Sequence, residues 1–184
     1  AILVNLAQRH NQKFAVFSPE NYPIKRHVIK LIRKYIGKPY GKPYNGTMSW
    51  DEAEQGREFI DAHFSFINST DITFKVTKIL DMAKICIIRE GINGLLIDPW
   101  NEVDHARPSN LSETEYISQS LTEIRKFARH NNIHIWVIAH PSKRKKEDWK
   151  NPPLLYDISG SAHWFNKADN GITVYRDDVT NNES

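Results

Sequence analysis

The chain has 184 residues, with 25 lysines and arginines against 22 aspartates and glutamates, so its formal net charge is +3. Hydrophobic residues make up 40% of it, which excludes a disordered polyelectrolyte. Residues 143–150 (KRKKEDWK) hold five basic and two acidic residues, so the whole charge excess lies in this one segment. This excludes a protein that is basic over its whole surface. We expect a single domain over residues 1–184, because one domain is the default at this length.

The single cysteine, Cys86, lies in an apolar run, which is typical of a small buried side chain. One cysteine excludes a disulfide framework, and this agrees with a reducing compartment. No apolar run approaches the ~18 residues that a membrane span needs, and no secretory signal pattern opens the chain. These features predict a cytoplasmic protein without a membrane partner.

The first half of the chain shows apolar residues at spacings that alternate between helical and extended. In chain order they predict a helix over 2–7, a strand over 14–17, a helix over 24–35 that Gly37 ends, an exposed loop over 37–48, a helix over 49–64 opened by a capping box at Ser49, and a short strand over 64–67. Nothing in front of the first helix caps it, so the chain is expected to open within an element.

The second half continues the same alternation. It predicts a helix over 74–89, a strand over 94–98, a helix over 112–128 with a capping box at Ser112, and strands over 134–139 and 171–175. Strands that read as nearly continuous apolar runs and alternate with helices indicate an α/β fold. The expected architecture is a mostly parallel sheet with helices on both faces.

Three of the predicted strands are followed by a polar residue, namely Glu20, Asp98 and His140. Because ligands of open parallel sheets bind beyond the carboxyl ends of the strands, these residues are candidates for one site. An apolar run that ends in a carboxylate, as at Asp98, is typical of the Walker B element that holds the water shell of a magnesium ion. Glu20 could act as a general base and His140 could sense a phosphate. Each residue also has a plain structural explanation, as a turn former, a solvated carboxylate or a hydrogen-bonded loop residue.

The basic segment follows directly after the strand that ends at His140. Cations beside an aromatic ring, here Trp149, suit a loop that binds single-stranded nucleic acid, because the cations bind phosphates and the ring can stack on a base. The candidate cations are Lys143, Arg144, Lys145 and Lys146. A solvated charged loop without a ligand is the alternative interpretation.

Four motifs occur in a set order along the chain: residues 17–21 (FSPEN), 94–102 (GLLIDPWNE), 137–141 (VIAHP) and 157–171 (DISGSAHWFNKADNG). Together they resemble the hexameric replicative helicases of the DnaB family, and most of all its DnaB/Twinkle-type primase-helicase branch. The resemblance covers nearly the whole chain. It implies a RecA-like P-loop NTPase core and an ATP-dependent DNA helicase motor that uses Mg²⁺ and ATP and moves on single-stranded DNA as a hexamer. It also implies the cytoplasm of a bacterial or phage-infected cell.

The same resemblance implies a role for each matching residue. Glu20 matches the catalytic glutamate that activates the attacking water, and Asp98 matches the Walker B aspartate near Mg²⁺. His140 occupies the position that couples the state of the γ-phosphate to the DNA-binding loop, in which residues 143–146 fall. Arg176 matches an arginine near the edge of the nucleotide.

The chain departs from this family in two places. No Gly-x-x-x-x-Gly-Lys-Ser/Thr run occurs in it, although a P-loop needs one to bind the phosphates. The arginine finger of the family is expected after Arg176, yet the chain stops at Ser184. These departures predict a partial motor domain that lacks the P-loop segment and has little or no NTPase activity alone. The alternatives are a non-catalytic nucleic-acid-binding module that kept the fold, and a small-molecule α/β enzyme.

Overall fold

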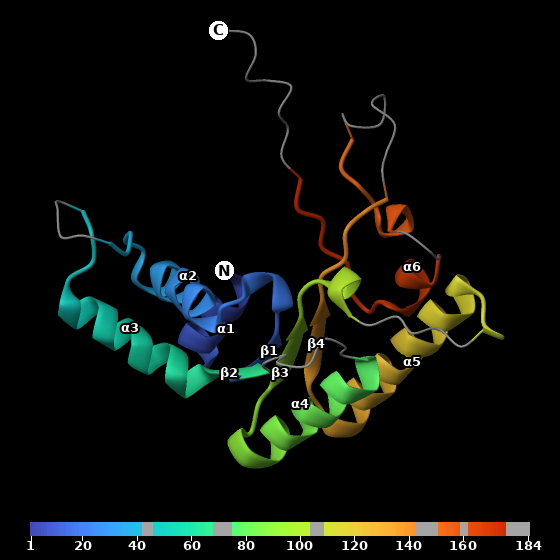
Figure 1. The fold of residues 1–184 in the computed structure, drawn as a ribbon, viewed down its shortest axis with the longest axis horizontal. Helices are drawn as coiled ribbons and strands as arrows, with labels where there is room; N and C mark the ends of the chain where they lie inside the picture. Colours follow the sequence, from blue (N-terminus) through green and yellow to red (C-terminus); the bar gives the residue numbers. More distant parts are fainter. Residues whose placement is uncertain (42–45, 68–74, 104–108, 143–150, 159–161, 176–184) are drawn as a thin grey trace, which may run out of the picture.

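Four parallel strands form a sheet at the centre of the chain (Figure 1). They are β1 (Phe14–Phe17), β2 (Phe64–Ile67), β3 (Gly94–Ile97) and β4 (His134–Val137). Their order across the sheet is β2-β1-β3-β4, and every neighbouring pair is parallel. The last residue of β1, Phe17, is in register with Ile67 and Ile97, and Ile97 is in register with Val137. The four strands therefore end side by side, which confirms the parallel sheet predicted from the sequence.

The computed structural model describes residues 1–41, 46–67, 75–103, 109–142, 151–158 and 162–175. The α-helices in these ranges are α1 (Ile2–His10), α2 (Ile24–Ile36), α3 (Trp50–His63), α4 (Val76–Glu90), α5 (Glu113–Asn131) and α6 (His163–Lys167). Short 3-10 helices occur at Pro19–Asn21 (η1), Trp100–Glu102 (η2) and Leu155–Asp157 (η4). The five helices expected from apolar spacing are confirmed, whereas α6 was not predicted.

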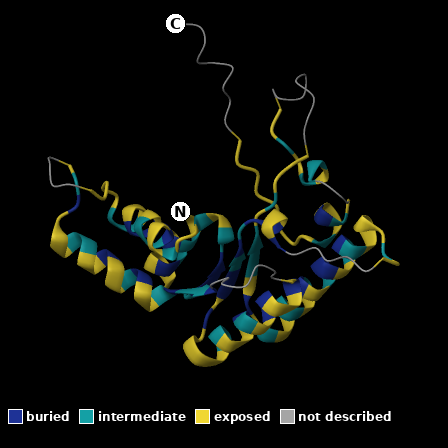
Figure 2. Ribbon diagram, in the orientation of Figure 1, coloured by how far each residue is buried: buried dark blue, intermediate teal, exposed yellow. Residues whose placement is uncertain are grey.

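Helices cover both faces of the sheet, as the sequence pattern predicted (Figure 1). Ala15 and Phe17 of β1 belong to a buried cluster with side chains of α4 and α5. The alternate residues of the same strand, Phe14 and Val16, belong to a second cluster with side chains of α1, α2 and α3. Buried residues accordingly run along the strands and the inner faces of the helices (Figure 2). Both faces of β1 are covered, and this explains why its sequence is continuously apolar.

Local signals set the ends of the longer helices. Ser49 and Ser112 each form a complete capping box: the serine hydroxyl accepts the backbone N–H three residues on, and a glutamate there accepts the serine N–H. Gly37 ends α2 with a φ of 78°, in the left-handed region that favours glycine. The structure therefore confirms the boundaries predicted at these three positions.

Residues 171–175 do not form the strand that their apolar alternation predicts. Val174 is 93% exposed and Ile172 is 61% exposed, so the segment buries neither face. The hydroxyl of Thr173 donates a hydrogen bond to the carbonyl of Pro153 instead of a ladder forming with the sheet. An apolar alternation predicts a strand only where another element covers one of its faces, and no described element covers this one.

The buried face of α4 allows a matched stability test. Ile79 is 0% exposed in the core, whereas Ile88 lies on the same helix and is 76% exposed. We expect Ile79→Val to lower the free energy of unfolding by about 0.5–1.5 kcal/mol, because it removes one buried methylene group. Ile88→Val makes the same chemical change at the surface and should shift it by less than about 0.5 kcal/mol. Urea unfolding of the two variants measures the difference, and equal effects would contradict the assigned packing of α4.

Candidate functional site

The carboxyl ends of β1, β3 and β4 are tied together by backbone hydrogen bonds that continue beyond the strands. The N–H of Asp98 donates to the carbonyl of Phe17 at 2.9 Å. On the other side, the N–H of Ile138 donates to Ile97 at 2.9 Å, and Trp100 donates to Ile138 at 2.7 Å. The segments that lead to Glu20, Asp98 and His140 therefore start from one edge of the sheet, as predicted.

Asp98 is a half-buried carboxylate immediately after β3. The hydroxyl of Ser18, which follows β1, donates to Asp98 Oδ2 across 3.2 Å. This bond links two neighbouring strand ends that are 80 residues apart in sequence. The carboxylate at the position predicted for magnesium is thus oriented by the segment that leads to Glu20.

Glu20 lies in η1, the single 3-10 turn that directly follows Ser18. The turn closes through two backbone bonds of 3.1 Å, from Asn21 N–H to Ser18 and from Tyr22 N–H to Pro19. Its side chain is exposed, and among the described residues it makes no ion pair. A carboxylate that is exposed at the edge of the sheet is free to accept a proton from a water molecule.

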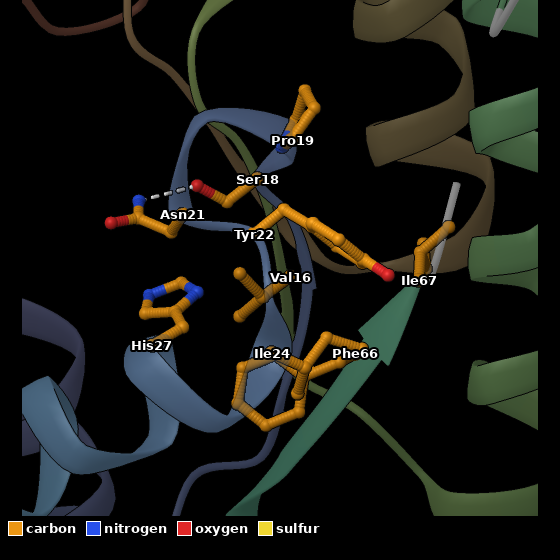
Figure 3. Close-up of a pocket in the computed structure, with 9 residues that line it drawn as sticks. All are labelled: Val16, Ser18, Pro19, Asn21, Tyr22, Ile24, His27, Phe66 and Ile67. Atoms are coloured by element: carbon orange, nitrogen blue, oxygen red, sulfur yellow. Dashed lines mark hydrogen bonds between the residues drawn. The ribbon is translucent and has the colours of Figure 1, made fainter. Parts of the chain in front are cut away.

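A small cavity lies beside η1, between the ends of β1 and β2 and the start of α2 (Figure 3). Its interior, about 20 Å³, has room for about one water molecule. His27 of α2 lines it and is only 9% exposed. The imidazole lies edge-on to the ring of Phe66, with the ring centroids 5.4 Å apart. A buried titratable side chain therefore lies directly behind the turn that carries Glu20.

Burial lowers the pKa of His27 below its ordinary value of 6.5; the charge of Asp98 opposes this shift and that of Lys30 adds to it. The unfolded chain therefore binds a proton at His27 at pH values where the folded chain does not. This contribution to stability is complete above pH 6.5 and is lost as the pH falls toward the folded pKa, with a slope of at most about 1.4 kcal/mol per pH unit for one proton. We expect His27→Phe to weaken the acid destabilisation seen in urea unfolding across this range.

The exposed His130 of α5 gives the control for this test. His130→Phe should leave the pH dependence of the free energy of unfolding as in the wild type. An unchanged pH dependence in His27→Phe would show that the buried imidazole does not contribute. Comparing the slopes of the two variants removes the contributions of the other histidines.

The donor set at the strand ends suits a magnesium ion that a nucleotide brings with it. Magnesium usually keeps several waters and is held by one or two carboxylates together with substrate phosphates. Asp98 supplies one such carboxylate, with the hydroxyl of Ser18 beside it. Within the described ranges, no group of three or more histidine, cysteine, aspartate or glutamate side chains could hold a metal ion. The residues therefore fit a shared nucleotide–magnesium site and not a cage built by protein side chains alone.

The basic segment begins at this same edge. Pro141, next to the exposed His140, forms an isolated antiparallel bridge with Ile158. Ser142 donates to the carbonyl of Asp157 from its N–H at 2.7 Å and from its hydroxyl at 2.9 Å. The residues before and after segment 143–150 are thus held together beside the end of β4. Lys143, Arg144, Lys145, Lys146 and Arg176 themselves lie outside the described residues.

The fourth motif, at residues 157–171, is anchored on α5. Lys167 of α6 donates to the carbonyl and the hydroxyl of Ser118, at 2.5 and 2.8 Å. Asp169 forms an ion pair with Arg125 at 2.9 Å. The polar residues of this motif therefore fix α6 on the helix that precedes β4.

Three residues of the edge were missed by the sequence analysis: Ser18, Asn21 and His27. Ser18 carried a usable signal, because it is the first polar residue after a buried strand, as Asp98 is. Asn21 and His27 carried none, because their places depend on how α2 packs against η1.

No family model matches the chain. A curated relative, the "Twinkle homolog protein, chloroplastic/mitochondrial" of Arabidopsis thaliana, is 42% identical over 182 residues, which cover 96% of this chain and 25% of the relative. Among solved structures, one of an isolated ATPase domain has a TM-score of 0.75 at 19% identity, over 99% of this chain and 65% of that one. A DnaB-like replicative helicase, described with its interactions with primase, has a TM-score of 0.72 at 16% identity, over 91% of this chain and 41% of that one. The chain thus spans a quarter of the curated relative, and the predicted RecA-like fold class is confirmed.

The predicted location in the cytoplasm of a bacterial or phage-infected cell is wrong. The curated relative is a chloroplastic/mitochondrial protein of a plant, which points to an organelle. A single cysteine agrees with any reducing compartment, so the composition could not separate the two. In the described part of the chain, no helix combines the length and the apolar character that crossing a membrane requires.

Proposed function

We propose that this chain, a DnaB/Twinkle-type RecA-like segment by its sequence similarity and its fold, forms part of the motor of an ATP-dependent replicative DNA helicase. The observation that carries the proposal is the hydrogen bond from Ser18 to Asp98, which joins the turn of Glu20 to the carboxylate after β3. Joined carboxylates at the carboxyl edge of a parallel sheet suit nucleotide hydrolysis. The relative's name supports an organellar location for the protein.

Each residue of the edge has a defined task in this proposal. Bound Mg²⁺ would neutralise charge on the phosphates of ATP, and Asp98 would hold the water shell of that ion. Glu20 would orient the attacking water and accept its proton. His140 lies between this edge and the basic segment 143–150, so it is placed to connect the nucleotide with single-stranded DNA.

The remaining contacts of the motor are proposed on the resemblance alone. Lys143, Arg144, Lys145 and Lys146 would bind the phosphates of single-stranded DNA, and Arg176 would lie near the edge of the nucleotide. The working assembly would be a hexamer. Residues 1–184 would act as one partial motor domain within it.

The 184 residues contain no Gly-x-x-x-x-Gly-Lys-Ser/Thr run, so the main phosphate-binding loop would have to come from outside them. We therefore expect the 184-residue chain, incubated with Mg²⁺ and ATP, to release phosphate no faster than a blank without protein. A coupled phosphate-release assay measures this. Robust turnover by the isolated chain would contradict this division of the site.

The missing run favours one alternative, a non-catalytic nucleic-acid-binding module that kept the RecA-like fold. The coding sequence upstream of Ala1 separates the two. A Gly-Lys-Ser/Thr loop within about 30 residues, the scale of one strand–loop–helix unit, supports the helicase motor, and a native start codon at Ala1 supports the module.

A further inference from the structure

A chain of three hydrogen bonds runs from the surface of α2 to the carboxylate of Asp98. Lys30 Nζ donates to Asn21 Oδ1 at 2.7 Å, and Asn21 Nδ2 donates to Ser18 Oγ at 2.8 Å. Ser18 Oγ then donates to Asp98 Oδ2 at 3.2 Å. Figure 3 shows the middle bond, between the turn of η1 and the end of β1. We call these four residues the relay.

The chemistry of its two ends gives the relay a single direction. An ammonium group can only donate and an ionised carboxylate can only accept. Lys30 therefore fixes the amide of Asn21 with its oxygen toward the lysine and its NH₂ group toward Ser18. Ser18 accepts from this NH₂ group, and its only proton is directed to Asp98. Each bond thus determines the orientation of the next one.

The relay also encloses the turn that carries Glu20. Ser18 precedes η1 and Asn21 is its last residue, so the Ser18–Asn21 bond spans the glutamate on both sides. The same serine binds Asp98, and therefore one connected set of bonds holds the glutamate turn against the aspartate. Lys30 attaches this set to α2, a helix that packs extensively against α3 on the other side of the sheet.

We infer that Asn21 and Lys30 are positioning residues, which hold Glu20 and Asp98 in their mutual arrangement for water attack on the nucleotide. The inference rests on the proposed function and extends it to two residues outside the carboxylate pair. Positioned groups act mainly in the transition state, so their loss lowers kcat more than it raises KM.

The first arm of the test detects the relay in the 184-residue chain itself, without nucleotide. In ¹⁵N-resolved NMR spectra, the side-chain amide resonances of Asn21 should move in Ser18→Ala and in Lys30→Met. They should stay in place in Lys25→Met, which removes an exposed lysine of the same helix. Backbone spectra show whether each variant keeps the fold. Asn21 resonances that do not respond to either relay variant would overturn the inference.

The second arm measures ATP hydrolysis by the native polypeptide that contains these residues. Asn21→Asp keeps a partner for Lys30 but cannot donate to Ser18, so it should lower kcat about tenfold, as expected for the loss of one hydrogen bond in a charged network. KM for ATP should change by less than about twofold, and half-maximal rate should need more Mg²⁺. Lys30→Met should lower kcat by a smaller factor, Lys30→Arg should restore it, and Lys25→Met should leave it unchanged.

The outcomes separate the two proposals. Hydrolysis in the wild type with normal kcat and Mg²⁺ dependence in Asn21→Asp would overturn the positioning role and leave the proposed function standing. No hydrolysis in the wild-type native polypeptide would overturn the proposed function and the positioning role with it, while the NMR arm would still report whether the relay forms. Reduced kcat in Asn21→Asp, with rescue by Lys30→Arg in the lysine series, would establish the inference.

Discussion

Glu20→Gln is expected to lower the rate of ATP hydrolysis by the native polypeptide roughly 10²–10⁴-fold, the usual contribution of a general base. Glutamine keeps the shape of the side chain and can still orient a water molecule, but it cannot accept the proton. Glu20 is exposed at the end of a closed turn, so the substitution should not disturb the fold. Binding of ATP should be retained, because the carboxylate is not expected to contact the phosphates in the ground state. Single-turnover kinetics and nucleotide titration measure the two quantities.

Glu123→Gln supplies the matched control, because Glu123 is an exposed carboxylate on α5, away from the edge of the sheet. It should hydrolyse ATP at the wild-type rate. A Glu20→Gln variant within about threefold of the wild type would remove the glutamate from the catalytic role, since such a change is far below the contribution of a general base. A parallel loss of ATP binding would instead indicate that Glu20 contributes to the ground-state complex.

The elements of the fold could be predicted because local rules determine most of them. The apolar run of β1 is continuous because helices cover both of its faces, and the capping boxes at Ser49 and Ser112 begin their helices where the pattern placed them. Residues 171–175 show where this reasoning fails. Their alternation is as regular as that of a strand, yet whether they pair depends on which elements lie nearby, and a local pattern carries no information about that.

The candidate site shows the same division. The positions of Glu20, Asp98 and His140 at one edge follow from a single rule on the ends of parallel strands. The relay could not be predicted in this way, because the bond between Lys30 and Asn21 requires α2 to turn back over η1. Sequence spacing does not encode that angle. The cellular location failed for a different reason, since organelle and cytoplasm impose the same demands on a chain with one cysteine.

The basic segment is expected to account for nearly all affinity of the 184-residue chain for single-stranded DNA. With about four phosphate contacts, the slope of log K against log salt should be about −3, since each contact to a single strand contributes about −0.7. Replacing Lys143, Arg144, Lys145 and Lys146 with glutamine should bring this slope close to zero. At about 0.1 M salt the affinity should fall roughly 10²–10³-fold, because the release of counterions from four phosphates is lost. Fluorescence anisotropy of a labelled strand over a range of salt concentrations measures both quantities.

A second fourfold variant separates a local effect from one of net charge. Lys25, Lys78, Lys84 and Lys126 are exposed on α2, α4 and α5, and replacing them with glutamine changes the formal charge by the same amount. If the segment beside β4 binds the phosphates, this variant keeps a slope near −3, because only contacting cations release counterions. Equal losses in both variants would mean that DNA responds to the overall charge of the molecule, and the segment would then have no special role. Since the excess of +3 lies entirely within residues 143–150, the two variants give opposite answers if binding depends on where the charge lies.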